Sequence, residues 1–271
     1  MNKSNNELKI MSFNIRVDTT FDKDHSWEFR KERVANEIYF FKPHIFGLQE
    51  ALKHQLDYLA NEFKEEYSYV GFGRDDGHDK GEFAPIFYDK DRIRLERYGV
   101  FWLSENLFEN GSIGWDAVFP RIVTWAEFFD LKTYKKLFFF NTHFDHEGRI
   151  AQEKSAELLL QKVGNFAGNN PVVVTGDFNV EEDSKAYNII TNGLGENSDF
   201  MLFDAKYISK HNHYGPTITY NAYGQKNYQT KIDYIFVNDR ITVLNHGILN
   251  SSWDNTYSSD HFPLVASIII K

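Results

Sequence analysis

The sequence places polar residues of the kinds that bind metal ions and phosphate at the borders of apolar stretches. The members of this set are Asn14, Glu50, His143, Asp177, Asn179, Asp233, Asp260 and His261. Taken singly, an Asn or Asp after an apolar stretch is most often a turn residue or a helix cap. Turn chemistry does not explain the whole set, so we expect these side chains to meet at one edge of a sheet structure.

These residue types suit metal-assisted attack of water on a phosphate ester. The Glu50 and Asp260 carboxylates and the Asn14 amide favour a hard cation, and the chain contains no cysteine for a zinc thiolate site. Magnesium (Mg²⁺) or manganese (Mn²⁺) is therefore the expected cofactor. Hydrolysis also needs an in-line water and positive charge around the phosphoryl oxygens, tasks that carboxylates and histidines can divide.

Apolar periodicity predicts short strands alternating with helices. The opening is typical of a strand at 7–17, a helix at 28–41, a strand at 44–50 and a helix at 54–63. Strands are then predicted at 67–74, 83–90, 94–104, 123–131 and 135–144, a helix at 149–166, and further strands at 171–179, 231–238, 241–250 and 261–270. No linker or low-complexity segment interrupts this α/β pattern, so we expect one domain over residues 1–271.

Composition narrows the classes of protein. With 271 residues, 42% of them hydrophobic, and 25 phenylalanines, the chain can bury a large core. Its beginning has no apolar leader and no membrane-spanning run, so we expect a soluble monomer without a membrane anchor, cytoplasmic as written, or secreted if a leader has been removed. The net charge of −9 disfavours long nucleic acid as a partner, because such binding relies on cationic surface.

Six short strings, in a fixed order, resemble the exonuclease-endonuclease-phosphatase superfamily, which includes deoxyribonuclease I, abasic-site endonucleases and bacterial sphingomyelinases. The strings are SFNIR, GLQE, NTHFDH, TGDFNV, KIDYIFV and SSDHFPL, and together they span nearly the whole chain. The resemblance implies a deoxyribonuclease I-like, four-layer sandwich of two mixed β-sheets flanked by helices, with the site at one edge. The intervening segments resemble a bacterial subgroup of the superfamily.

The resemblance also implies roles for the residues of the strings. Glu50 would bind the divalent ion, with Asn14 beside it and Asp260 contributing directly or through water. Asp177 would align or deprotonate the attacking water, and Asn179 would hold that water or a phosphate oxygen.

Two histidines would lie on opposite sides of the phosphate in such a site. His261, oriented by Asp233, would contact the scissile phosphate. His143 would face it from the other side and stabilise charge or assist the leaving group. Glu82 resembles the carboxylate that pairs with this histidine in deoxyribonuclease I.

Substrate contacts are expected from residues outside the strings. Arg121 and Arg74 could reach phosphate oxygens, although arginines in strands and loops are often surface ion-pair partners. His213 and Tyr220, in HNHYGPTITYNAYG, lie where the superfamily carries a substrate-facing loop. His146 and Arg149 could reach the substrate or only shape the start of the following helix.

Several functions stay open at this point. We favour a phosphodiesterase or phosphatase acting on a small or sugar-containing phosphate ester, since the acidic charge disfavours a nonspecific nuclease. The alternatives are a nuclease acting on DNA or RNA, a sphingomyelinase-like lipid hydrolase whose interfacial hairpin would be 101–115, and a catalytically silent binding protein. A silent protein should lack Glu50, His143, Asp177 or His261, and all four are present.

Overall fold

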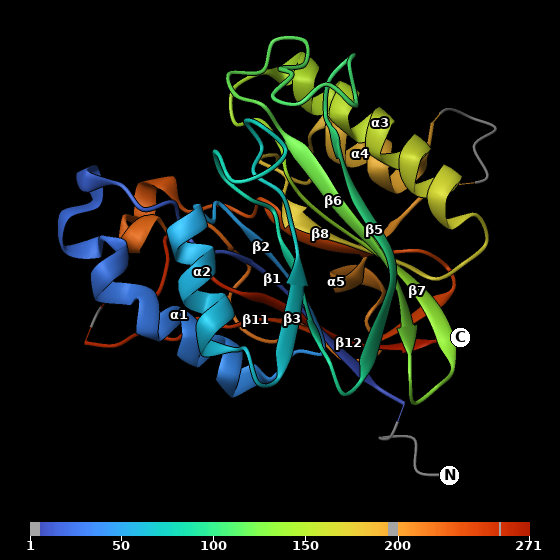
Figure 1. The fold of residues 1–271 in the computed structure, drawn as a ribbon, viewed down its shortest axis with the longest axis horizontal. Helices are drawn as coiled ribbons and strands as arrows, with labels where there is room; N and C mark the ends of the chain where they lie inside the picture. Colours follow the sequence, from blue (N-terminus) through green and yellow to red (C-terminus); the bar gives the residue numbers. More distant parts are fainter. Residues whose placement is uncertain (1–5, 195–199, 255) are drawn as a thin grey trace.

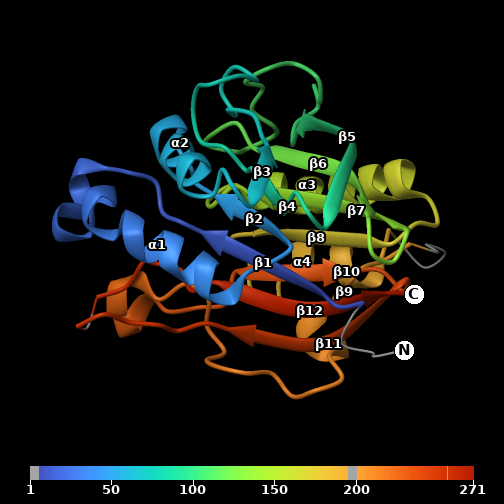
Figure 2. The same cartoon turned by 60° about the horizontal axis from the view of Figure 1, so that its bottom comes forward.

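The computed structural model describes residues 6–194, 200–254 and 256–271, and it contains two six-stranded sheets packed against each other (Figure 1, Figure 2). The strands of the first sheet are β1 (Leu8–Asn14), β2 (Ile45–Gln49), β3 (Tyr67–Val70), β4 (Ile86–Asp89), β11 (Ile241–Ile248) and β12 (Leu264–Ile270). The strands of the second are β5 (Ile93–Trp102), β6 (Ile122–Asp130), β7 (Lys135–His143), β8 (Val172–Asp177), β9 (Phe203–Asp204) and β10 (Asp233–Val237). Their orders are β11-β12-β1-β2-β4-β3 and β5-β6-β7-β8-β10-β9.

Helices cover the outer faces of both sheets. Figure 1 shows α1 (Trp27–Phe41) and α2 (Lys53–Glu62) on one side of the molecule and α3 (Arg149–Ala167) and α4 (Lys185–Asn192) on the other. The remaining helical segments are short: α5 (Ala205–Ile208) and the 3₁₀ turns η2 (Thr20–His25), η3 (Ala222–Gly224) and η4 (Lys226–Tyr228). This helix-sheet-sheet-helix arrangement confirms the fold expected from the sequence.

Alternating apolar side chains build the layers. Val173 and Phe139 belong to the core between the two sheets, whereas Val172, Val174 and Phe138 face the core under α3 and α4. A third core joins α1 and α2 to the first sheet. A strand that is buried on both faces needs apolar residues at successive positions, which explains the run of three valines.

A buried polar network locks the sheets together near the site. The Asn141 amide donates to the backbone oxygens of Leu48 and Pro85 at 2.7 and 3.0 Å, and its Oδ1 accepts from Gln49 at 2.7 Å and Thr175 at 3.0 Å. Gly47 makes this approach possible, because a Cβ there would lie 2.3 Å from Asn141 Oδ1. The two sheets are therefore held in one register where β2 crosses β7.

Strand directions bring the ends of six strands to one edge. β1 runs parallel to β2, and β7 runs parallel to β8, so their carboxyl ends lie together. β10 is antiparallel to β8 and β12 is antiparallel to β1, so these two strands begin where the others end. Asn14, His143 and Asp177 are the last residues of their strands, and Asp233 is the first residue of β10.

The observed elements differ from the predicted ones mainly at their ends. The last strand begins at Leu264 and not at His261, because Pro263 has no N–H to donate to a ladder. The strand predicted at 67–74 ends at Val70, where the glycines at 71 and 73 pass closely against Pro85 and Lys80. The short elements α4, α5 and β9 were not predicted.

The structure bears on two expectations about membranes, one about a spanning helix and one about an interfacial hairpin. In the described part of the chain, no helix is both long and apolar enough to cross a bilayer. In the segment 101–115, Phe101, Trp102 and Leu103 are buried, whereas Phe108 is exposed. The aromatic start of this segment therefore belongs to the core and not to an exposed hairpin.

Candidate active site

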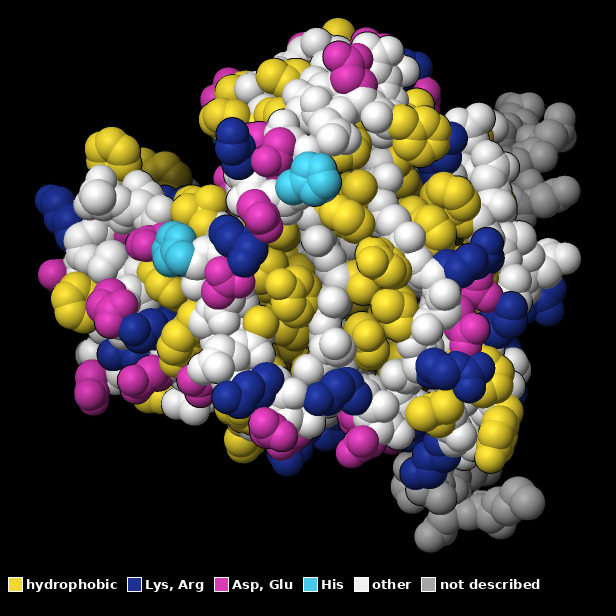
Figure 3. All heavy atoms as spheres, viewed as in Figure 1, with side chains coloured by type: hydrophobic (Ala, Val, Ile, Leu, Met, Phe, Trp, Pro, Cys, Tyr) yellow, Lys and Arg dark blue, Asp and Glu magenta, His cyan; other side chains and the backbone are white. Residues whose placement is uncertain are grey.

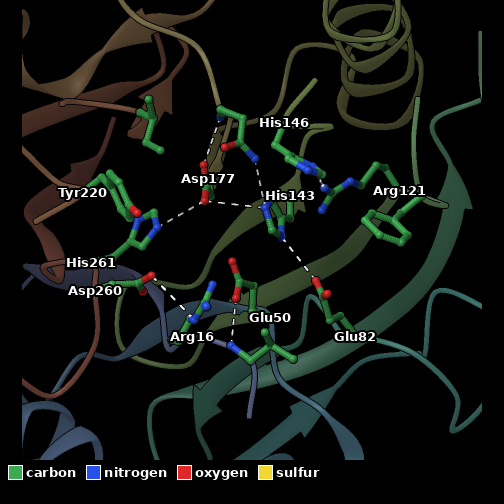
Figure 4. A pocket seen from close by; sticks show the side chains of 14 residues that line it. Arg16, Glu50, Glu82, Arg121, His143, His146, Asp177, Tyr220, Asp260 and His261 are labelled. Carbon is green, nitrogen blue, oxygen red and sulfur yellow. Dashed lines mark hydrogen bonds and ion pairs between the residues drawn. The ribbon is translucent and has the colours of Figure 1, made fainter. Parts of the chain in front are cut away.

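A pocket of about 380 Å³ opens at the edge where the six strands meet, and we call it the main pocket (Figure 4). It is lined by Arg16, Val17, Glu50, Glu82, Phe119, Arg121, His143, His146, Asp177, Asn179, Tyr220, Ile232, Asp260 and His261. Most of the residues predicted from the sequence are in this lining. They come from both sheets, although up to 211 positions separate them in the chain.

Asn14 links the two sheets at the floor of the main pocket. Its fully buried amide Nδ2 donates to Glu50 Oε1 and to Asp177 Oδ2, each at 2.9 Å. The other Glu50 oxygen accepts from the backbone N–H of Val17 at 2.8 Å. Glu50 has a φ of 63°, a left-handed conformation that a non-glycine residue keeps only where its surroundings hold it. The fold thus fixes the Glu50 carboxylate against Asp177.

Asp177 lies between two imidazoles. Its Oδ2 is 3.6 Å from His143 Nε2 and 3.7 Å from His261 Nε2, as Figure 4 shows. Its Oδ1 accepts from the backbone N–H of Asn179 at 2.9 Å. Asn179, with a φ of 52°, donates its amide to the Phe144 carbonyl at 3.0 Å and lies 3.0 Å from His143 Nε2. The apolar β8 therefore ends in a tight polar turn that aims Asp177 and Asn179 at the histidines.

His261 is held by Asp233 and is charged. Its Nδ1 lies 2.8 Å from Asp233 Oδ2, and both side chains are buried. Burial alone would lower the pKa of His261, but Asp233, followed by Asp177 and Asp260, raises it to about 10. The ring is therefore an imidazolium at neutral pH, and its Nε2–H faces Asp177.

His143, on the other side of Asp177, is neutral. Burial, reinforced by the positive charges of Arg121 and Arg74, lowers the pKa of His143 well below its usual value. Its Nδ1 has no hydrogen-bond partner in the described chain and lies 3.6 Å from Glu82 Oε2, too far for a direct bond. One charged and one neutral imidazole thus face the same carboxylate.

Arg121 and Arg74 lie behind His143 but at different depths. Arg121 is 4% exposed; its Nε donates to Asp145 at 3.4 Å, its Nη2 lies 3.1 Å from His146 Nδ1, and its Nη1 has no partner among the described residues. Arg74 does not line the main pocket; it donates to Glu82 at 2.7 Å and lines a small cavity behind His143. Arg121 therefore lines the main pocket and keeps one buried donor without a partner among the described residues, whereas Arg74 holds Glu82.

The residues at the centre of the main pocket fit a divalent cation. Two groups have potential ligand atoms within 4.8 Å of one another, namely Glu50 with His143 and Asp177, and Asp177 with Asp233 and His261. Burial, and then the charge of Asp233, raises the pKa of Asp177 to about 7 against the lowering effect of His261. Carboxylate oxygens are the donors that hard cations prefer. Glu50 and Asp177 are therefore the residues that would hold such an ion.

Asp260 belongs to neither of these groups in the described chain, although it lines the main pocket. Its Oδ2 lies 3.7 Å from Arg16 Nε, and burial raises its pKa. Arg16 also makes a bidentate pair with Asp22, with both nitrogen–oxygen distances at 2.9 Å. Asp260 thus lies beside a cation of the protein itself.

The two predicted loop residues lie in different places. Tyr220 lines the main pocket, and its ring centroid is 5.0 Å from that of His261. His213 does not line it: its Nδ1 lies 2.8 Å from His246 Nδ1, and its Nε2 lies 2.6 Å from the Pro216 carbonyl. Only the second half of the HNHYGPTITYNAYG segment therefore reaches the site.

Sequence reasoning missed Arg16 and Phe119 as pocket residues. Arg16 follows Asn14 by two positions in SFNIR, and its φ of 59° turns its side chain toward Asp260. Phe119 is 44% exposed at the pocket wall and packs near Arg74 and His146. The proximity of Arg16 to Asn14 was a usable signal, whereas nothing near Phe119 in the sequence marks it.

Comparisons with known proteins agree on the family and the fold. A model of the Endonuclease/Exonuclease/phosphatase family matches residues 11–261. The crystal structure of an endonuclease/exonuclease/phosphatase from Bacteroides vulgatus is 37% identical, covers 98% of this chain and 99% of its own, and superimposes with a TM-score of 0.92.

Two further solved structures come from proteins with a named activity or a bound product. A mannosyl-6-phosphatase from Bacteroides thetaiotaomicron is 32% identical over 97% of this chain and 100% of its own, with a TM-score of 0.87. TDP2 from D. rerio, complexed with a single-strand DNA product, is 18% identical over 97% and 98% of the two chains, with a TM-score of 0.73. The second likeness supports the fold alone.

Proposed function

The chain belongs to the endonuclease/exonuclease/phosphatase family, whose members hydrolyse phosphoester bonds, and we propose that it hydrolyses small, sugar-containing phosphate esters with the help of Mg²⁺ or Mn²⁺. The observation that carries this proposal is the position of Asp177 between the charged His261 and the neutral His143, beside Glu50. The presence of all four side chains also argues against a silent binding protein.

The chain's own residues divide the work of hydrolysis. Asp177 orients the attacking water and accepts its proton, and Asn179 positions that water or a phosphoryl oxygen. The His261 imidazolium donates a hydrogen bond to a phosphoryl oxygen, and Asp233 holds its ring in place. Arg121, which lines the main pocket, adds positive charge from the side of His143. The bond from phosphorus to the water oxygen forms as the bond to the alcohol oxygen breaks; the leaving oxygen takes a proton from the solvent, and Asp177 returns the proton of the attacking water to the solvent.

The proposed cation would be held by Glu50 and Asp177, with Asn14 fixing both carboxylates. When bound, a divalent cation offsets the negative charge that grows on the phosphoryl oxygens. An amide binds a hard cation through its oxygen, and Asn14 Oδ1 accepts from the Arg16 N–H at 2.9 Å, while Asn14 Nδ2 donates to both carboxylates. We therefore propose Asn14 as the residue that orients the ligands, and Asp260 as a partner of Arg16 at the pocket wall.

Support for a small sugar ester as the substrate comes from the volume of the main pocket, from the net charge of the chain and from its similarity to a sugar phosphatase. The main pocket of about 380 Å³ lies within the range of small-molecule sites. A relative with 32% identity along nearly the whole chain is a mannosyl-6-phosphatase. The net charge of −9 gives an extended polyanion no long-range attraction.

A nuclease is the second candidate, and the face of the molecule over β3 and β5 gives it little support. On the face seen in Figure 3, Lys and Arg side chains alternate with Asp and Glu around a hydrophobic centre over the β3 and β5 edges. Such a mixed surface does not form a cationic track for a phosphate backbone. A lipid hydrolase is disfavoured because Phe101 and Trp102 are buried.

A panel of substrates tests the proposal. The purified protein, with Mg²⁺ and separately with Mn²⁺, is given 4-nitrophenyl phosphate, bis(4-nitrophenyl) phosphate, hexose 1- and 6-phosphates, dinucleotides, single-stranded RNA, nicked DNA and sphingomyelin. We expect the highest kcat/KM for a sugar phosphate, with only a weak dependence on salt. Efficient cleavage of long nucleic acid with a steep salt dependence would instead establish the nuclease.

A further inference from the structure

A second cavity adjoins the main pocket, and we call it the side pocket. It measures about 590 Å³ and shares His146 and Asn179 with the main pocket. Its walls come from the start of α3 and from the loop between β8 and α4. A substrate whose phosphate lies near Asp177 would therefore extend directly into it.

The junction of the two pockets is firmly built. Gln152 donates its amide to the carbonyls of Asp145 and Asn179, at 2.9 and 3.2 Å, and so ties the loop after β7 to the turn after β8. The buried Asp145 carboxylate accepts from the backbone N–H groups of Glu147 and Gly148 at 3.1 and 2.8 Å. The Nη2 atom of the buried Arg121 lies 3.1 Å from His146 Nδ1 at this junction. The opening between the pockets is thus held in place by hydrogen bonds from both loops.

The charge of the side pocket selects against anions. It is lined by four carboxylates, those of Glu147, Glu153, Glu181 and Asp183, and by two cations, Arg149 and Lys185. Lys185 is already paired with Glu153 at 2.5 Å. A second phosphate placed here would meet an excess of negative charge. A polynucleotide, whose next phosphate lies one residue away, is therefore a poor fit on this side.

Hydrogen-bonding groups remain free in the same walls. Arg149, Glu181 and Asp183 are exposed, and their side chains make no ion pair or hydrogen bond with the described residues. Carboxylates accept hydrogen bonds from hydroxyl groups, and the guanidinium donates to hydroxyl oxygens. His146 is the only aromatic ring in the described lining, so a nucleobase would find little to stack on.

We propose that the side pocket binds the hydroxyl groups of a neutral sugar whose phosphate ester lies in the main pocket. The inference rests on the proposed function. It adds where the sugar of the substrate binds, and that this sugar carries no charge. Glu181, Asp183 and Arg149 are the specificity-determining residues, and none of them takes part in the chemistry at Asp177.

Removing the free carboxylates tests this placement. The double variant Glu181→Ala with Asp183→Ala should raise KM for hexose 6-phosphates about tenfold and leave kcat/KM for 4-nitrophenyl phosphate within roughly twofold of the parent. A matched control removes two exposed carboxylates elsewhere, with Glu65→Ala and Asp239→Ala, and should leave both substrates unaffected. Equal effects of the two double variants would overturn the proposal.

A second measurement tests the charge argument. The parent should have a higher kcat/KM for a hexose 6-phosphate than for the corresponding 1,6-bisphosphate. The double variant Glu181→Gln with Asp183→Asn should lower the ratio of these two kcat/KM values about fivefold. An unchanged preference would contradict an acidic sugar pocket. If the parent hydrolyses 4-nitrophenyl phosphate but no hexose phosphate, the side-pocket proposal fails, whereas the proposal that the protein hydrolyses phosphate esters is retained. If it hydrolyses neither with Mg²⁺ or Mn²⁺, the proposed function fails and the sugar proposal fails with it.

Discussion

The Nδ1 atom of His261 lies 2.8 Å from Oδ2 of Asp233, and this contact sets both the orientation and the charge of the ring. Asp233 also pairs with Asp177 in the β8–β10 register, so the two carboxylates lie beside each other at the ends of neighbouring strands. Only the Asp233 carboxylate hydrogen-bonds the imidazole; Asp177 remains 3.7 Å from its Nε2. Asp233 therefore orients the imidazole of His261, whereas Asp177 does not hydrogen-bond it.

We predict that Asp233→Asn and His261→Ala lower kcat by similar factors, on the order of 100-fold or more. The double variant should be little worse than either single one, because the pair acts as a unit. Kinetics of the three variants on 4-nitrophenyl phosphate provide the measurement. If the two losses multiply in the double variant, the residues act independently and the pairing has no catalytic role.

Much of the fold was predictable because local patterns agree with the global arrangement. The run Val172–Val174 is apolar on both faces of β8, and the periodicity of 149–166 closely matches α3. The residues of the six strings were found because each lies next to such a pattern. Asn14, His143 and Asp177 at strand ends are examples.

Other features depend on contacts between distant segments, and so no local pattern reveals them. The close approach of Gly47 to Asn141 brings together residues 94 positions apart, and Arg16 becomes a pocket residue only because Asp260 folds back beside it. His213 has the residue type of a substrate contact, but its two ring nitrogens contact His246 and the Pro216 carbonyl. The tertiary structure therefore decides which histidines reach the site.

Arg30 is predicted to position the loops of the site without touching the substrate. It is 1% exposed and donates to backbone carbonyls on both sides of the pocket floor: His25 at 2.9 Å, Arg16 at 2.6 Å, Ser258 at 3.3 Å and Ile15. Arg30→Lys cannot bridge all of them, because an ammonium lacks the planar fork. We expect destabilisation of about 1–3 kcal/mol and a fall in kcat that exceeds the change in KM.

The matched control for Arg30 is Arg33→Lys on the same helix. Arg33 is partly exposed and donates to the Thr256 hydroxyl, so its replacement should leave kcat unchanged. Kinetics at a temperature well below each variant's Tm separate positioning from unfolding. A kcat of Arg30→Lys equal to that of the parent would reduce Arg30 to a purely structural residue.

Glu37 should make stability depend on pH. Its carboxyl is 4% exposed and accepts from the Ser258 hydroxyl at 2.7 Å; burial raises its pKa to about 8 against the opposing effect of the serine hydrogen bonds. An unfolded glutamate has a pKa of about 4.3, so between these two values the folded state holds the extra proton. The stabilisation is complete below about pH 4 and is lost as the pH rises through about 8, by up to roughly 1.4 kcal/mol per pH unit.

Urea unfolding of Glu37→Gln across this range measures the effect. The variant stays neutral at every pH, so its free energy of unfolding should fall less than that of the parent between about pH 5 and about pH 8. Glu32→Gln, an exposed position on the same helix, should follow the parent. Parallel curves for the parent and Glu37→Gln would mean that Glu37 ionises without cost.

The last prediction concerns the cation and uses a readout that does not require turnover. If Glu50 and Asp177 hold a divalent ion, Mg²⁺ or Mn²⁺ should raise the Tm of the parent, because an ion that binds only the folded state stabilises it. Glu50→Gln should abolish that rise and lower kcat about 100-fold or more, since an amide retains the shape of the side chain without its charge. The control Glu65→Gln removes an exposed carboxylate and should keep the rise. Without metal, Glu50→Gln should unfold at a lower temperature than the parent, because its NH2 group would face Asn14 Nδ2 or the Val17 N–H, both of which donate to the Glu50 carboxylate; the readout is therefore the rise in Tm on adding metal to each variant. Full activity of the parent in excess EDTA, or a metal-induced rise in Tm that survives in Glu50→Gln, would exclude Glu50 as a ligand and with it the proposed metal site.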